Sequence, residues 1–135
     1  MGVGVSISLT LEEIRQRYGE NTPRRQFLCT RLQTVVRLLV ETGQLRHLYL
    51  FGSFTTAKPT PGDLDCLAVM AAGFTTTNLI LPHLEVFQHD TCRLLYQIDV
   101  FWVTEAVPTE HLNAMLDVFS RDREGALQPI IEVTL

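Results

Sequence analysis

The chain has 135 residues, enough for one domain with a buried core and too few for two domains of ordinary size. Apolar residues make up 46% and charged residues 19%, a composition that excludes an intrinsically disordered chain. The net charge of −4 argues against nonspecific binding of nucleic acid through its phosphates. We therefore expect one domain over residues 1–135.

The charge is distributed unevenly along the chain. Residues 1–58 contain eight Lys or Arg and four Asp or Glu, a net charge of +4, whereas residues 59–135 contain three and eleven, a net charge of −8. Lys58 is the only lysine. The second half therefore carries either an acidic surface or an acidic site.

Neither a membrane segment nor a disulfide framework is expected. The longest unbroken apolar run, Cys66–Ala72, is far shorter than a transmembrane helix, and residues 1–8 lack the pattern of a signal peptide. Cys29, Cys66 and Cys92 have no paired spacing, which indicates buried or free thiols. These features predict a cytoplasmic protein with no membrane contact.

Two helices are expected in the N-terminal part, residues 1–44. The capping-box pattern Thr10-Leu-Glu-Glu13 predicts a short helix that runs to about Tyr18 and is ended by Gly19. Thr22-Pro23 is typical of an N-cap followed by proline at the first helical position, and this second helix should run to Gly43.

Strands are expected in the central part, residues 45–105. An apolar strand, Leu48–Phe51, ends at Gly52, and a second begins at Asp63 and runs to about Met70. Residues 55–62 contain two prolines and a glycine, so they should be irregular. The third strand is Gln97–Val103.

Helices should connect and follow these strands. Segment 75–96 is expected to be helical in its second half, with four apolar residues on the core side: Leu84, Phe87, Leu94 and Leu95. In the C-terminal part, residues 106–135, Thr109 should cap a helix that ends at Gly125, and Ile130–Thr134 should form a last strand. The alternation predicts an α/β (α+β) fold, a mixed β-sheet flanked by helices.

The candidate chemistry lies between residues 50 and 103. Because strand side chains alternate, Asp63 and Asp65 should point to the same face at the start of a buried strand. Asp99 lies in the interior of the next apolar strand and can join them. Three neighbouring carboxylates repel one another unless a cation offsets their charge, so Asp63, Asp65 and Asp99 are the candidate ligands of Mg²⁺ or Mn²⁺.

Such a cluster suits phosphoryl transfer, with Asp99 accepting the proton of the attacking hydroxyl. Gly52 allows close approach of a phosphate to the backbone, and the hydroxyl and amide of Ser53 can donate to it. The Asp-x-Asp motif of haloacid-dehalogenase-type phosphatases follows an apolar strand, and here the apolar run comes after Asp65. The same difference argues against an Asp-x-Asp glycosyltransferase.

Phe51-Gly52-Ser53, nine intervening residues, Asp63-Leu-Asp65 and the later Asp99 together resemble the polymerase-β-like nucleotidyltransferase superfamily. More narrowly, nearly the whole chain resembles an uncharacterised bacterial group of small nucleotidyltransferase-like proteins. The shared features include the Gly-Ser-Phe-Thr-Thr-x-Lys-Pro loop, Arg24-Arg25, the Asp-Val-Phe-Trp strand and the ending Phe119–Gly125.

The resemblance implies a nucleotidyltransferase core in residues 45–105 with NTP as a substrate and catalytic Asp63, Asp65 and Asp99. It implies transfer of a nucleoside monophosphate to an acceptor hydroxyl of a protein, an RNA or a small molecule, with release of pyrophosphate. It also suggests a role in a toxin–antitoxin or defence pair, with a partner protein or a homodimer completing the pocket.

The resemblance assigns Gly52, Ser53 and Lys58 to nucleotide binding, since several relatives carry a basic residue in the loop of Lys58 that meets the triphosphate. A solvated loop lysine is the alternative for Lys58. Thr56 stands about where relatives often carry an arginine, which keeps open a second reading, a non-catalytic protein that binds a nucleotide or a partner.

Five N-terminal arginines either form solvated helix faces or approach the acidic site: Arg15, Arg17, Arg24, Arg25 and Arg31. The four histidines show no metal-ligand spacing, so surface or capping roles are expected for them.

Overall fold

The computed structural model describes residues 6–135. The prediction that residues 1–8 form no signal peptide concerns mostly residues 1–5, which lie outside the described residues. The elements follow in the order β1 (Ser6–Leu9), α1 (Leu11–Tyr18), α2 (Pro23–Glu41), β2 (Leu45–Phe51), the short 3₁₀ helix η1 (Ser53–Thr55), β3 (Asp65–Met70), α3 (His83–Val86), α4 (His89–Tyr96), β4 (Asp99–Thr104), α5 (Thr109–Phe119) and β5 (Ile130–Val133).

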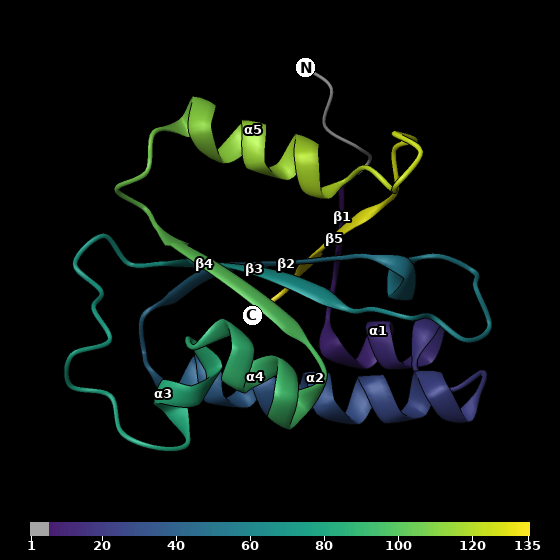
Figure 1. Ribbon diagram of the computed structural model, residues 1–135, viewed down its shortest axis with the longest axis horizontal. Coiled ribbons are helices and arrows are strands. Elements are labelled where there is room, and N and C mark those ends of the chain that lie inside the picture. The colour runs from purple at the N-terminus through teal and green to yellow at the C-terminus, as the bar shows by residue number, and fades with distance from the viewer. Residues whose placement is uncertain (1–5) are drawn as a thin grey trace.

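The strands form one mixed sheet with the order β1-β5-β2-β3-β4. Strand β2 is antiparallel to both β3 and β5, whereas β1–β5 and β3–β4 are parallel pairs. Helices α1–α4 cover one face of the sheet and α5 lies over the other (Figure 1). The predicted α/β (α+β) class, a mixed sheet flanked by helices, is confirmed.

Local signals position the first two helices as expected. Thr10 and Glu13 form the reciprocal capping box of α1, and Gly19 follows its last residue. The Thr22 side chain accepts a hydrogen bond from the amide of Arg25, and Pro23 occupies the first position of α2.

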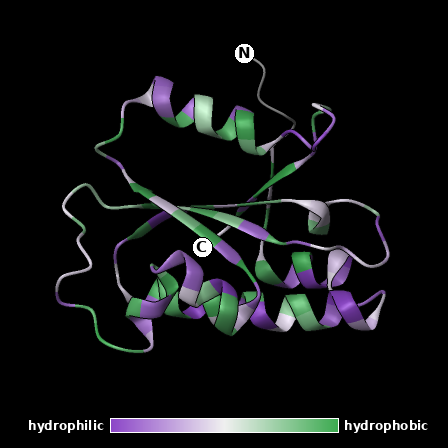
Figure 2. Cartoon of the chain, in the orientation of Figure 1, coloured by the Kyte–Doolittle hydropathy of each residue, from purple (hydrophilic) through white to green (hydrophobic). Residues whose placement is uncertain are grey.

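Each face of the sheet has its own apolar cluster. The larger cluster lies between the sheet and α1–α4, and α2 contributes several buried residues to it, among them Leu28, Leu32 and Leu39. A smaller cluster under α5 contains Phe51, Leu67, Leu116 and Ile130. In Figure 2 hydrophobic colour runs along the central strands and alternates with hydrophilic colour on the helices. No described helix is long and apolar enough to cross a membrane.

Several sequence expectations are wrong in detail. Strand β3 begins at Asp65, not Asp63, because Asp63 is held in the preceding loop by hydrogen bonds with the Ser53–Phe54 segment. Strand β1 was not predicted, and its four residues are short enough to escape a periodicity test.

The helical predictions beyond residue 75 also need correction. Leu94 and Leu95 are 81% and 42% exposed, since Cys92 is the buried residue of α4. Thr109 is the first residue of α5 and gives no side-chain cap. The helix ends at Phe119, and Gly125 adopts a positive φ of 84° in a later turn.

The three cysteines are free and buried, as expected.

Candidate active site

The sheet brings Gly52, Asp65 and Asp99 together at one end of the neighbouring strands β2, β3 and β4. Phe51 pairs with Asp65 in the antiparallel β2–β3 ladder, so Gly52 leaves β2 where β3 begins. Asp65 pairs with Asp99 in the parallel β3–β4 ladder, so these two residues open neighbouring strands at the same end. Adjacent strands lie about 4.8 Å apart, which makes the two carboxylates neighbours.

Gly52 is required at its position for two reasons. Its φ of +92° is a conformation that residues with a side chain rarely adopt. A Cβ there would also lie 3.0 Å from Oδ2 of Asp65 and 3.1 Å from Oδ2 of Asp63. The backbone of Gly52 therefore touches both carboxylates, and Asp63 joins the cluster although it lies outside the strand.

Ser53 fixes the position of Asp63. Its amide donates to Oδ1 of Asp63 over 2.8 Å, and its hydroxyl donates to the same oxygen. The amide of Phe54 donates to the Asp63 carbonyl over 3.1 Å. The two donors that we expected Ser53 to offer to a phosphate thus bind Asp63 in this arrangement.

The carboxylates differ in their affinity for protons. Burial, together with the neighbouring Asp63 and Asp99, raises the pKa of Asp65 to about 8. Partial burial also raises the pKa of Asp63, but the hydrogen bonds from Ser53 and Asp65 and the charge of Lys58 together outweigh it, and the pKa ends below its ordinary value. At neutral pH, Asp65 is therefore protonated between its two neighbours.

Helix α4 supplies two further groups to Asp99. Nε2 of His89 lies 2.9 Å and Nε of Arg93 3.7 Å from Oδ1 of Asp99. Nε2 and Oδ1 are both shielded from solvent, yet they are not aligned as a hydrogen bond. Sequence reasoning missed both side chains, although their separation of four residues on a helix just before the Asp99 strand was a usable signal.

The three carboxylates do not form a preorganised metal site. Within residues 6–135, no group of three or more His, Cys, Asp or Glu side chains is arranged to hold a metal ion. The chemistry of these oxygen ligands nevertheless fits a hard cation. The Asp65 carboxyl keeps its proton between Asp63 and Asp99, and the buried Oδ1 of Asp99 lacks an aligned hydrogen-bond donor, so a cation would satisfy both groups.

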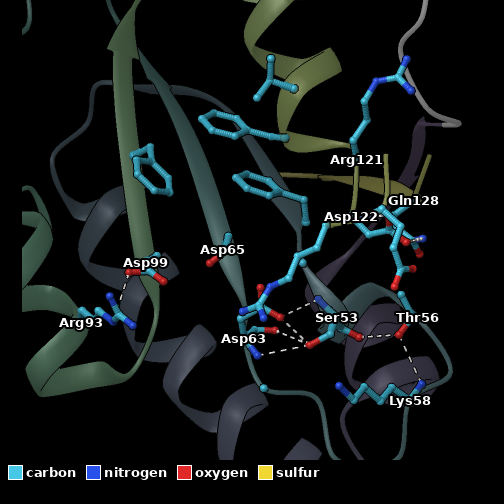
Figure 3. Close-up of a pocket in the computed structure, with 18 residues that line it drawn as sticks. Ser53, Thr56, Lys58, Asp63, Asp65, Arg93, Asp99, Arg121, Asp122 and Gln128 are labelled. Atoms are coloured by element: carbon cyan, nitrogen blue, oxygen red, sulfur yellow. Dashed lines mark hydrogen bonds and ion pairs between the residues drawn. The ribbon is translucent and has the colours of Figure 1, made fainter. Parts of the chain in front are cut away.

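The three carboxylates line a pocket of about 840 Å³ (Figure 3). Lys58 and Thr56 line one side of it, and Arg93, Arg121 and Arg123 also contribute to the lining. The positive charge of Lys58 helps to lower the pKa of Asp63, so this lysine acts on the site electrostatically. Its predicted contact with a triphosphate stays a prediction.

An aromatic column forms another wall of the pocket. The ring of Phe119 stacks on Phe51 at 4.7 Å and on Phe101 at 5.3 Å, and Phe101 stacks on His89 at 5.0 Å between centroids. These contacts connect α5 to β2, β4 and α4.

Two of the N-terminal arginines approach the site through its loop. Arg25 is 2% exposed, so its alternative as a solvated helix face is wrong, and it binds carbonyl groups of residues 54–58. Arg24 binds the carbonyls of Pro61 and Gly62.

Fold and site together define a mixed α/β protein with a cluster of three carboxylates in a pocket at one end of its sheet. Residues 3–134 match the family described as "Family of unknown function (DUF6932)", and the chain belongs to this family.

Among solved structures, similarity is found to a chain of the complex described as tri-AMPylated Shewanella oneidensis HEPN toxin with MNT antitoxin. The TM-score is 0.35 at 16% identity, and the match covers 63% of this chain and 61% of that chain. A TM-score this low gives no basis for inference about fold or function. A comparison with curated proteins gave no match.

Proposed function

We propose that this protein is a metal-dependent nucleotidyltransferase, which transfers a nucleoside monophosphate from an NTP to an acceptor hydroxyl and releases pyrophosphate. The observation that carries the proposal is the in-register pair Asp65–Asp99, joined by Asp63 next to Gly52-Ser53 under a pocket. The match to the polymerase-β-like motif agrees with this reading but is an argument from resemblance.

The reaction needs carboxylates to hold the metal and accept a proton, and basic side chains to bind the phosphates. The acceptor oxygen attacks the α-phosphorus, the bond from that phosphorus to the bridging oxygen breaks, and pyrophosphate departs. Asp99 would accept the acceptor proton. Lys58 and the arginines of the pocket would bind the phosphates and orient them.

Asp63, Asp65 and Asp99 would hold Mg²⁺ or Mn²⁺, which supplies charge neutralisation for the phosphates and lowers the pKa of the attacking hydroxyl. Holding the cation requires Asp65 to give up its proton, because carboxylates bind metals in the ionised form. Binding should therefore release a proton and strengthen as the pH rises towards 8.

A second candidate function is a non-catalytic protein that binds a nucleotide or a partner. Two observations favour it: both Ser53 donors are engaged by Asp63, and the described carboxylates are not preorganised for a metal. Calorimetry separates the candidates, because only the enzyme requires Mg²⁺-dependent NTP binding.

The decisive experiment is transfer of label from each α-³²P NTP, with a cell lysate supplying the acceptor. We expect a labelled product from the wild type and at least about a hundredfold less from Asp63→Asn with Asp65→Asn. Glu110→Gln, an exposed change at the start of α5, is the matched control. Equal labelling by the double variant would refute the proposal.

A further inference from the structure

The segment between Ser53 and Asp63 carries three residues that line the pocket, Thr56, Lys58 and Gly62, and beyond η1 it has no regular structure. Such a segment needs an external support if its side chains are to keep fixed positions. The support comes from the first turn of α2, which lies about thirty residues earlier in the chain.

Arg25 is the centre of this support. Its guanidinium makes five hydrogen bonds to carbonyl oxygens of Tyr18, Phe54, Thr56 and Lys58. The bond to Phe54 measures 2.8 Å, and the shorter of the two bonds to Lys58 measures 2.7 Å. The guanidinium carbon also lies 5.4 Å from the centre of the Phe54 ring.

No carboxylate of the described residues pairs with Arg25, although the side chain is almost fully buried. A buried guanidinium stays charged and has five N–H donors, all of which find carbonyl oxygens here. Its positive charge, which no carboxylate of the described residues neutralises, lies outside the carboxylate pocket, in a second hollow that it lines together with Thr55, Thr56 and Ala57.

The neighbouring residues extend the same support. The hydroxyl of Thr22 donates to the carbonyl of Pro59 over 2.7 Å. Arg24 donates to the carbonyls of Pro61 and Gly62 over 2.9 and 3.3 Å. The first turn of α2 thus holds carbonyl groups along the whole segment from residue 54 to residue 62.

We infer that Arg25 is a positioning residue for the anionic part of the substrate. It fixes the loop so that Thr56 and Lys58 line the pocket, and its positive charge favours a polyphosphate in that pocket. The part about polyphosphate rests on the proposed nucleotidyl transfer, whereas the part about loop order does not. The three donors of a lysine ammonium cannot span these four carbonyls, so the role needs the planar guanidinium.

The first measurement is hydrogen exchange of the loop amides, followed by mass spectrometry. In Arg25→Gln we expect peptides from residues 53–58 to exchange about tenfold faster or more, while peptides from β3 keep wild-type rates. Arg31→Gln is the control, because Arg31 lies on the same helix and contacts the Phe27 ring. It should leave both sets of peptides unchanged.

The second measurement separates positioning from general structural support. We expect Arg25→Gln to weaken Mg²⁺-dependent ATP binding about tenfold or more and to change the Kd for Mg²⁺ alone by less than about twofold. Free guanidinium should restore ATP binding to Arg25→Ala, whereas urea and sodium chloride should not. If Arg25→Gln does not fold, Arg25→Lys replaces it, with a smaller effect in the same direction.

The outcomes distinguish the two proposals. Unchanged loop exchange in a folded Arg25 variant would overturn the positioning role whatever the activity. Equal losses of Mg²⁺ and ATP affinity would also overturn it, since a merely structural residue affects both. A wild type that binds no ATP, together with a loop that loosens in Arg25→Gln, would refute nucleotidyl transfer and the polyphosphate role and leave the loop-ordering role standing.

Discussion

Ionisation of the Asp65 carboxyl should destabilise the fold as the pH rises, and Asp65→Asn should remove this pH dependence. The variant keeps the size of the side chain and its ability to donate to Asp63 and Asp99, but it carries no titrating group. The pKa of Asp65 is about 8 in the folded protein against an ordinary value of 3.8. The native state therefore retains a proton that the unfolded chain releases, and the stabilisation by the neutral carboxyl is complete below about pH 4 and lost as the pH rises through about 8.

The size of the effect follows from this difference. About four pKa units at about 1.4 kcal/mol each set an upper limit of about 6 kcal/mol. Solvent at the mouth of the pocket screens part of the repulsion, so we expect about 2–3 kcal/mol. That is a large fraction of the stability of a domain of this size.

Urea unfolding in the presence of EDTA measures the effect at about pH 5.5 and about pH 8.5. Between these values the wild type should lose about 1–2 kcal/mol more than Asp65→Asn, because the interval covers little more than half of the range from about pH 4 to about pH 8, and the exposed control Glu110→Gln should follow the wild type. Parallel losses in the wild type and Asp65→Asn would refute the assignment of the raised pKa. Saturating Mg²⁺ at the higher pH should stabilise the wild type and leave Asp65→Asn unchanged.

Three further variants test other parts of the site. Gly52→Ala introduces a Cβ 3.0 Å from the Asp65 carboxylate at a positive φ, so it should lower stability by about 1–3 kcal/mol and abolish Mg²⁺ binding, as seen by thermal unfolding and calorimetry. Lys58→Gln should weaken ATP binding about tenfold and change Mg²⁺ affinity little, and an equal loss of both would contradict its role towards the phosphates. Phe119→Ala removes both stacking contacts of α5 and should cost about 3 kcal/mol in urea unfolding, whereas exposed Val118→Ala should cost less than about 0.5 kcal/mol.

The features predicted from the sequence were those with a local physical cause. Thr10, Glu13 and Pro23 act within one helical turn, so their patterns predict α1 and α2 correctly. For Asp99 the sequence predicted only that it could join Asp63 and Asp65 from a neighbouring strand. The structure adds the parallel register that pairs Asp65 with Asp99.

The features that the sequence did not predict depend on contacts between distant segments. Asp63 leaves the strand because Ser53, ten residues earlier, binds its carboxylate. His89 approaches Asp99 only through the packing of α4 beside β4. Leu94 lies on the exposed side of α4, and no rule of spacing separates such a leucine from a core leucine in an eight-residue helix.

The uneven charge of the chain has a structural meaning at the loop of residues 54–62. The positive first half contributes the buried charge of Arg25, which binds carbonyl groups of this loop, and the negative second half contributes Asp63, Asp65 and Asp99, which line the pocket. The loop itself carries Lys58, which lines the same pocket as the carboxylates and helps to lower the pKa of Asp63. The charges of an NTP–metal complex are complementary to these groups: its cation would bind the carboxylates and its phosphates would bind the basic side chains. The proposed nucleotide binding therefore rests on the distribution of charge in this pocket rather than on the net charge of −4.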